Sequence, residues 1–352
     1  MAGYGEGIYR HKEIRLKKRN LTTVLKRVNC ASSAGTGIHP VFSDVSSEWL
    51  ISQKPQIKES SYVKYANMVN AYLNPAFAPR KIEEISRDDV SSFCIALVNS
   101  GGQRSSGLSP KTINDLLSVL RSIFRYAEEE KGLNVSNISG ISVKLPYRPM
   151  NILSISEQKN LEEYLRKELT PCNMGILLCM YTGLRIGEIC ALTWKDISST
   201  EPVLYVNKTM QRIQHMGDAT PKTRVMISTP KSSRSVRAIP LPSEIYQLLQ
   251  EQRKDNEAYV LTGTGSRYME PRSLENRFKK ALDHAGIKHM GFHALRHTFA
   301  TRCVELGFDI KSLSEILGHS SVNITLNKYV HPSMDLKRKN MNMLSGLYTD
   351  MQ

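Results

Sequence analysis

The stretch Thr182-Gly-Leu-Arg185-Ile-Gly-Glu188 decides how the second half of this 352-residue chain is interpreted. An apolar helix is predicted to run up to Thr182, a glycine interrupts it, and a second helix begins after the arginine. A helix start of this kind can present backbone N–H groups and one guanidinium to a single anion. Glu188, one turn further on, could fix that guanidinium. Taken alone, the segment is better explained as a capping turn with a surface Arg–Glu pair.

Segments further along the chain carry residues whose side chains could bind the same anion or react with it. They place Lys231 in Thr229-Pro-Lys-Ser-Ser, His293 and Arg296 in His293-Ala-Leu-Arg-His297, His319 in Leu317-Gly-His-Ser-Ser, and Tyr329 in Asn327-Lys-Tyr-Val-His. With Arg185 they form a set of cations, imidazoles and one phenol. Such a set suits reaction at a phosphodiester, in which cations hold the phosphate, a general acid serves the leaving oxygen and a tyrosine attacks phosphorus.

Taken singly, most of these residues have a simpler explanation. Lys231 is expected in a turn between two strands, where an ammonium at a hairpin tip could reach a leaving oxygen, but a turn lysine is usually only solvated. Lys222 and Arg234 compete for the same role, and the hairpin position is the only independent reason to choose Lys231. A lone His319 after a helix-ending glycine would usually be a cap, and a lone Tyr329 a packing residue.

His293 and Arg296 are spaced so that both can face one phosphate, because residues i and i+3 lie on the same side of a helix. His293 and His297 also have the i, i+4 spacing of a zinc-binding helix. A zinc protease helix carries Glu after its first histidine, and here that position holds Ala294. An arginine on the same face would repel a cation, so no metal is expected. We expect His297 to be a structural histidine packed against its own helix.

The chain is strongly basic, with a formal net charge of +15 and a pI near 9.5. A protein of this charge most often meets a polyanion, and a basic surface kept for solubility is the alternative. The excess is concentrated in residues 1–30, which hold eight basic side chains against two acidic ones, a net +6. This cluster suits a nucleic-acid-binding arm and a solvated leader equally well.

Six cysteines are present, and none pair as C-x-x-C. Cys94, Cys190 and Cys303 lie on helical apolar stripes, which favours buried free thiols in a reducing compartment. No apolar run approaches the roughly 18 residues of a membrane span, and the N-terminus has no apolar stretch typical of a secretory signal. We therefore expect no membrane span and a cytoplasmic location.

Helical periodicity fills residues 41–133 and predicts four helices. The apolar stripes that mark them are Phe42, Val45, Trp49 and Leu50; Tyr62, Tyr65, Met68, Val69 and Tyr72; Val90, Phe93, Ile95 and Leu97; and Ile113, Leu116, Leu117, Leu120, Phe124 and Ala127. Ser86 opens the third helix with a capping box, and Ser109 caps the fourth, which Gly132 ends. This region is predicted to form a small all-helical domain.

The pattern changes in the second half of the chain. Residues 134–150 show little periodicity and are expected to link two domains. One helix is expected from Ser156 to about Leu165. A period of two then predicts three short strands in a small antiparallel sheet, over 203–206, 225–228 and 235–241. Helices are expected to resume at Ser243, Pro271, His293, Ile310 and Val322. The second half is therefore predicted to be α+β, with most of its mass helical.

The joint order of the candidate segments is far more specific than any one of them. An arginine on a Gly-flanked turn, a lysine between strands, His-x-x-Arg, Gly-His and a tyrosine, in that order, resemble the tyrosine recombinase family, also called phage-type integrases. The family's first box, T-G-L-R-x-G-E and then L-x-W-x-D, matches residues 182–188 and 192–196. Its second, H-x-L-R-H-T, L-G-H-S and Tyr, matches residues 293–298, 317–320 and 329. Among members, the chain is most similar to integrases of phages and conjugative transposons of Gram-positive bacteria.

The resemblance implies a site-specific recombinase that cuts and rejoins DNA through a 3′-phosphotyrosine, without metal, nucleotide or other cofactor, to integrate or excise a mobile element. It implies a mainly α fold with a small antiparallel sheet, in which a helical SAM-like core-binding domain and an α+β catalytic domain form a C-shaped clamp on DNA. The expected parts are a basic N-terminal segment (1–40), the core-binding domain (41–133), the linker (134–150), the catalytic domain (151–329) and a tail exchanged between subunits (330–352).

All six catalytic positions hold the family's residues. The implied roles are phosphate binding by Arg185 and Arg296, proton donation by Lys231, handling of the tyrosine proton by His293, donation to a phosphate oxygen by His319, and nucleophilic attack by Tyr329. The expected partners are double-stranded DNA at attachment or core sites and a homotetramer on that DNA. An excisionase and a host DNA-bending protein are left open as further partners.

Other functions remain open at this point. A type IB topoisomerase would use similar chemistry on one duplex, and a non-catalytic DNA-binding protein would need neither Tyr329 nor Lys231. A metal-dependent nuclease would need a carboxylate cluster beside the histidines, and none is evident. The chain also departs from the family at its start, where only residues 5–9 resemble the first strand of an arm-binding domain. That domain is expected to be reduced or atypical.

Overall fold

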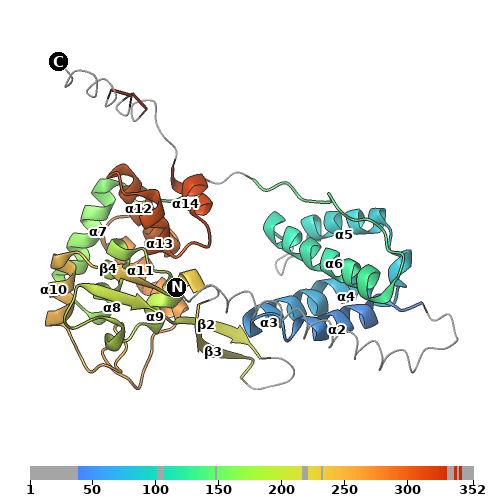
Figure 1. Cartoon of the computed structure of the whole chain (residues 1–352), viewed down its shortest axis with the longest axis horizontal. Coiled ribbons are helices and arrows are strands. Elements are labelled where there is room, and N and C mark those ends of the chain that lie inside the picture. Colours follow the sequence, from blue (N-terminus) through green and yellow to red (C-terminus); the bar gives the residue numbers. More distant parts are fainter. Residues whose placement is uncertain are drawn as a thin grey trace, which may run out of the picture. The chain divides into compact units, whose positions relative to one another are not determined.

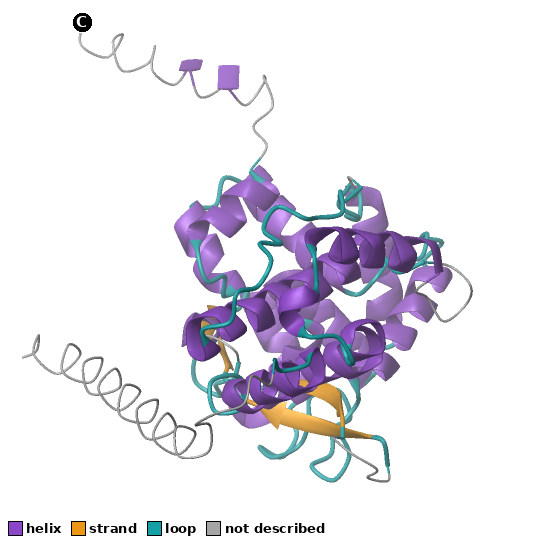
Figure 2. Ribbon diagram, turned by 90° about the vertical axis from the view of Figure 1, so that its right-hand side faces the viewer, coloured by secondary structure: helices purple, strands orange, loops and turns teal. Residues whose placement is uncertain are grey.

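In a computed structural model, the chain is described at residues 39–100, 107–146, 149–215, 221–230, 233–330, 337–338 and 341–342. It divides into two compact units. The first contains the chain through Ile57 and Lys64–Leu145, and the second contains Lys58–Val63 and the chain from Pro146 onward. Most of the described residues are helical, and the strands belong to the second unit (Figures 1 and 2).

The described part of the first unit is built from helices. Its elements are α2 (Phe42–Gln53), the second half of α3 (Glu59–Met68), the π-helical turn η1 (Val69–Leu73), α4 (Asn74–Phe77), the 3-10 turn η2 (Ile82–Glu84), α5 (Arg87–Ser100) and α6 (Pro110–Lys131). Ser109 caps α6 by accepting from the Thr112 backbone N at 3.2 Å, and Gly132 ends it in the left-handed conformation. The predicted stripes of α2 and α6 are buried, which confirms both helices.

Two of the predicted stripes are wrong in part. In α5, Ile95 is 62% exposed and Cys94 is buried in its place, because positions four and seven after Val90 share its face and position five does not. Along α3 the predicted tyrosines are only partly buried. Val63 and Ala66 form the buried side, and the wider turn η1 carries that side on to Leu73.

The stretch after α6 is fastened to the first unit. Asn114 binds the backbone of Val143 twice, donating to its carbonyl at 2.7 Å and accepting from its N–H at 2.9 Å. Arg87 donates to the carbonyls of Asn137 and Ser139, at 3.1 and 2.7 Å. These side chains satisfy backbone groups that no strand or helix would pair.

The second unit carries the remaining elements. They are α7 (Ile155–Lys167), α8 (Pro171–Thr182), α9 (Ile186–Ala191), η3 (Trp194–Asp196), β1 (Val203–Val206), β2 (Thr209–Gln214), β3 (Thr223–Ser228), η4 (Ser233–Ser235), β4 (Arg237–Pro240), α10 (Ser243–Glu251), α11 (Pro271–His284), α12 (His293–Glu305), α13 (Ile310–Leu317) and α14 (Val322–Tyr329). The last five helices begin at the residues predicted for them. α7 has the predicted position, with a capping box between Ser154 and Glu157.

The strands differ from the prediction. Among the described residues, four strands form two antiparallel pairs, β1 with β4 and β2 with β3, where Val203 faces Pro240 and Thr209 faces Ser228. The sequence reasoning missed β2 because its buried residues, Met210 and Ile213, are three positions apart and break the period of two. The prediction of a small antiparallel arrangement is confirmed, and that of one three-stranded sheet is wrong.

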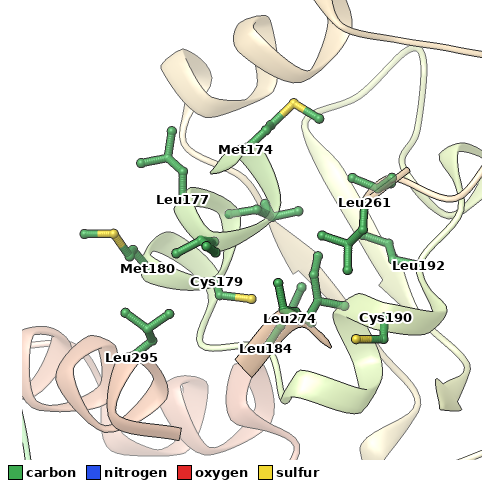
Figure 3. Packing of buried hydrophobic residues seen from close by; sticks show 14 of the residues in the cluster. Met174, Leu177, Cys179, Met180, Leu184, Cys190, Leu192, Leu261, Leu274 and Leu295 are labelled. Carbon is green, nitrogen blue, oxygen red and sulfur yellow. The ribbon is translucent and has the colours of Figure 1, made fainter. Parts of the chain in front are cut away.

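A large apolar core in this unit contains buried side chains from elements throughout the range α7 to α12. Figure 3 shows part of it, including Leu177, Cys179, Leu184 and Cys190. A smaller cluster lies among α12, α13 and α14 and includes Cys303. Cys94, Cys190 and Cys303 are buried free thiols, as predicted. Within the described residues, no helix is both long and apolar enough to cross a membrane.

Candidate active site

Two glycine turns frame the site. Gly183 ends α8 with φ 62° and Gly318 ends α13 with φ 63°, a left-handed conformation in which any other residue is strained. Each turn delivers one predicted site residue. Arg185 stands directly before α9, and His319 directly follows Gly318. The two glycine turns therefore fix the backbone positions from which the Arg185 and His319 side chains extend.

The two predicted arginines are fastened to these same turns. Arg296, in the first turn of α12, donates from Nη1 to the Gly183 carbonyl at 2.9 Å and from Nη2 to the Leu317 carbonyl at 2.7 Å. Arg185 donates from Nη2 to the Gly318 carbonyl at 3.1 Å. Arg296 is 2% exposed, whereas the Arg185 side chain is 35% exposed. A guanidinium has five N–H donors, so these bonds leave donors for an anion.

Glu188 is a buried carboxylate held between two arginines. Its Oε1 accepts from Arg185 Nη1 at 2.8 Å, and its Oε2 accepts from the Arg185 backbone N at 3.0 Å and from Arg237 Nη2 at 2.9 Å. Burial by itself raises the pKa of Glu188, but the hydrogen bond and charge of Arg237, with the charge of Arg185, lower that pKa overall. The carboxylate is therefore ionised at neutral pH and orients Arg185.

Arg237 is a member of the site that the sequence reasoning missed. It comes from β4, its side chain is 6% exposed, and its Nε donates to the Ile316 carbonyl at 2.5 Å. With its bonds to Glu188, it joins β4, α9 and the end of α13. The strand pattern could have indicated that Arg237 is buried, because it lies two positions before Ile239 and therefore on the same face of the strand. A buried arginine needs a carboxylate partner.

Tyr329 lies inside the site and not at the surface. It ends α14, is 6% exposed and packs in the cluster formed with α12 and α13. Its hydroxyl lies 2.9 Å from His297 Nδ1. The His319 ring is parallel to the phenol, with centroids 6.3 Å apart, and its Nδ1 lies 2.8 Å from Thr325 Oγ1.

His297 has a second contact beyond the one predicted for it. Its ring packs edge-to-face on His293 of its own helix, with centroids 4.5 Å apart, as expected for a structural histidine. Its Nδ1, however, faces the Tyr329 hydroxyl on another helix. His297 therefore packs against its own helix, as predicted, and also contacts a second helix. Within the described part of the chain, no three His, Cys, Asp or Glu residues are grouped to hold a metal ion.

The electrostatics of the site keep its imidazoles neutral. Burial is the largest cause, and it lowers the pKa of His293 and of His319 to about 4 and the pKa of His297 to about 3. The charges of Arg296 and Lys328 lower all three pKa values further. Burial and the charge of nearby Arg185 also lower the pKa of Arg296 to about 9. An anion bound here would offset this crowding of positive charge.

The predicted Lys231 lies outside the described residues. The strands on either side correct the geometry assumed for it, because β3 pairs with β2 whereas β4 pairs with β1. The two strands that flank Lys231, β3 and β4, are therefore not paired with each other as the prediction assumed. Of its competitors, Lys222 directly precedes β3, and the Arg234 guanidinium donates to the Ser320 carbonyl, beside His319.

Comparison with known proteins matches this architecture to a family. The model of the phage integrase family matches residues 151–335, more than half of the 352 residues. The chain belongs to this family. A second model, the N-terminal SAM-like domain of phage integrases, matches residues 41–97. The resemblance drawn from the sequence boxes is thereby confirmed.

Individual relatives of this integrase are distant. The tyrosine recombinase XerC-like protein of Caldanaerobacter subterraneus subsp. tengcongensis is 28% identical over 316 residues, which cover 83% of this chain and 79% of the relative. The transposase from transposon Tn916 of Enterococcus faecalis is 23% identical over 316 residues, 83% of this chain and 75% of the relative. These identities leave the individual site residues to be judged on their own geometry.

Solved structures share the fold. The Tn1549 transposon integrase in complex with transposon right end DNA matches with a TM-score of 0.70 at 22% identity, over 87% of this chain and 100% of that one. A lambda integrase dimer bound to a core site matches with a TM-score of 0.61 at 16% identity, over 83% and 96% of the two chains. The mainly helical fold with small antiparallel sheets is thus confirmed.

As an integrase of this family, the protein is a tyrosine recombinase, an enzyme that cleaves and rejoins DNA strands. The comparisons give no support to the type IB topoisomerase alternative.

Proposed function

We propose that this integrase recombines double-stranded DNA at a specific attachment or core site and so moves a mobile element into or out of a larger DNA. Support comes from relatives named for such elements, the Tn916 transposase and the ICEBs1 integrase of Bacillus subtilis. A solved lambda integrase is a tetramer bound to a Holliday junction. By extension, this chain would act as a homotetramer on DNA, in the cytoplasm. An excisionase and a host DNA-bending protein stay predictions.

The main support for the proposal is that the guanidinium groups of Arg185 and Arg296 lie in the same site as the Tyr329 phenol. Burial, the largest cause, raises the pKa of the Tyr329 hydroxyl overall, whereas the charges of Arg296 and Arg185 and a hydrogen bond with Arg296 lower it. Guanidinium forks match the non-bridging oxygens of a phosphodiester better than an ammonium does. His319 lies beside the same phenol and would donate to a phosphate oxygen. Arg185, Arg296 and His319 would therefore hold the scissile phosphate in front of Tyr329.

The proposed reaction exchanges the phosphodiester bond to the 5′ oxygen for a bond to tyrosine of similar energy. Tyr329 Oη attacks phosphorus, the bond from phosphorus to the 5′ oxygen breaks, and a 3′-phosphotyrosine forms. Lys231 is proposed to donate the proton that the leaving 5′ oxygen takes. A 5′-hydroxyl from another duplex can then reverse the step, which exchanges strands without ATP or metal. Transition-state charge on the phosphate oxygens is the reason that the site needs its cations.

The domain organisation is proposed on the same grounds. Residues 41–133 would form the core-binding domain and 151–329 the catalytic domain, with 134–150 between them and 330–352 exchanged between subunits. The matches of the family models to residues 41–97 and 151–335 support this division. The net charge of +15 suits a protein whose two domains close on DNA as a C-shaped clamp.

A strand-joining assay tests the proposed function. Two separate duplexes carry the short direct repeat that flanks the element encoding the protein, and the reaction contains excess chelator and no nucleotide. We expect recombinant duplexes that join one partner to the other, and none when the repeat is scrambled. Relaxation of a plasmid without joining would indicate a topoisomerase instead. Joining that depends on an added divalent ion would contradict the proposed mechanism.

A further inference from the structure

The contact between His297 and Tyr329 has no place in the catalytic set deduced from the sequence. The Tyr329 hydroxyl lies 2.9 Å from His297 Nδ1, and the ring centroids are 5.8 Å apart at 50°. Burial raises the pKa of Tyr329, so at neutral pH the phenol keeps its proton and donates it in this hydrogen bond. Nδ1 must then be the acceptor, which places the imidazole's own proton on Nε2.

The neighbouring imidazoles are arranged differently. His319 stacks parallel to the phenol and directs its Nδ1 at Thr325 Oγ1. The His293 ring packs edge-on against His297, and although His293 and Tyr329 are both described, no hydrogen bond joins them. Of the three histidines, His297 is therefore the one whose ring nitrogen meets the reacting hydroxyl.

The surroundings of His297 keep its ring unprotonated. The groups that face it come from α12 (His293 and Arg296), from α14 (Lys328) and from the turn before α14 (His319). Burial and these groups lower the pKa of His297 to about 3, so the ring is neutral at neutral pH. An anionic phosphodiester held by the arginines would offset the neighbouring positive charge and make the same nitrogen more basic.

We infer that His297, and not His293, holds the nucleophile of this integrase and takes its proton, a step that rests on the function proposed above. As Tyr329 Oη forms its bond to phosphorus, its O–H bond breaks and the proton moves to His297 Nδ1. The 5′ oxygen leaves with the electron pair of its broken bond to phosphorus and takes a proton from the general acid. In the reverse step His297 returns the proton to the phenol as the 3′-phosphotyrosine is resolved.

The substitution His297→Asn separates holding from proton transfer, because the amide oxygen can accept the hydrogen bond but cannot take the proton. The measurement is the rate of covalent complex formation at saturating concentrations of a nicked core-site duplex. We expect a loss of about 10²-fold or more in rate, with unchanged DNA affinity. We also expect the remaining rate to rise about tenfold per pH unit, because hydroxide must replace the base. Imidazole added to His297→Ala should restore part of the rate.

His289→Asn is the matched control, because His289 is an exposed imidazole that pairs with Asp283 and has no contact with the Tyr329 hydroxyl among the described residues. It should cleave at the wild-type rate. A wild-type rate and pH profile in His297→Asn would overturn the inference. So would the appearance of the tenfold-per-unit profile in His293→Asn alone, because His293 would then be the base. If the wild-type protein itself forms no covalent complex, the proposed function fails before this question arises.

Discussion

At the scale of single residues, the two site arginines are held in place by hydrogen bonds within the protein. Arg185 is oriented by Glu188 and by the Gly318 carbonyl, and Arg296 by the carbonyls of Gly183 and Leu317. Donors fixed in this way need no reorganisation when charge develops on a phosphate, which is the main source of electrostatic catalysis. As a consequence, several cations and neutral imidazoles lie close together in the site, which disfavours protonation of the imidazoles.

That crowding predicts an acid-labile fold. The pKa values of His293, His297 and His319 lie near 4, 3 and 4 in the folded protein, below the ordinary value of 6.5. The unfolded chain therefore binds more protons in this range, so the free energy of unfolding should decrease as pH falls from about 6.5 toward 4. Each histidine contributes at most about 1.4 kcal/mol per pH unit, and less where solvent screens it.

The measurement is chemical denaturation at pH 6.5 and pH 5.0, a window above the ordinary pKa of carboxyl groups. His297→Asn should reduce the pH dependence of unfolding, and the exposed control His289→Asn should not. A wild-type protein equally stable at both pH values would show that the site does not lower the pKa values of these imidazoles.

At the scale of elements, Arg237 connects three parts of the site. It reaches from β4 to Glu188 on α9 and to the Ile316 carbonyl near the end of α13. The position of the His319 turn relative to Arg185 therefore depends on a residue that itself has no predicted contact with DNA.

Arg237→Met should be strongly destabilising, because it removes one partner from a buried ion pair. Such losses cost about 3–5 kcal/mol, and the Arg185 contact that remains to Glu188 favours the lower end. Arg212→Met is the matched control, since the Arg212–Glu270 pair lies at the surface and should cost less than about 1 kcal/mol. Urea denaturation of both variants measures the difference. Equal losses in the two would contradict the bridging role of Arg237.

Helix starts such as Ser243 and Pro271 were predictable because proline, serine and apolar spacing act within one turn of the chain. The pairing of β4 with β1 was not, since strand partners are set by contacts distant in sequence. The same reason hid the partners of Arg237 and His297, which lie on other elements. The glycine turns were predictable because a positive φ is a local requirement.

At the scale of the whole molecule, the six candidate site residues in their order and the net charge of +15 were sufficient to predict the family. No single segment could do so, because each has a more ordinary explanation by itself. The basic segment 1–30, Lys231 and most of the tail lie outside the described residues. Their assignments as an atypical arm region, a general acid and an exchanged tail therefore stay predictions.

The central claim is that Tyr329 attacks phosphorus with the help of the cations around it. The most direct measurement traps the wild-type protein and Tyr329→Phe on a nicked core-site duplex, separates covalent complexes under denaturing conditions and maps the modified peptide by mass spectrometry. Tyr329→Phe should bind the duplex as the wild type does. We expect nucleotide attached through a 3′-phosphate to the Tyr329 peptide in the wild type and no covalent complex in the variant. A covalent complex at wild-type level in Tyr329→Phe, or an adduct on another residue, would contradict the account.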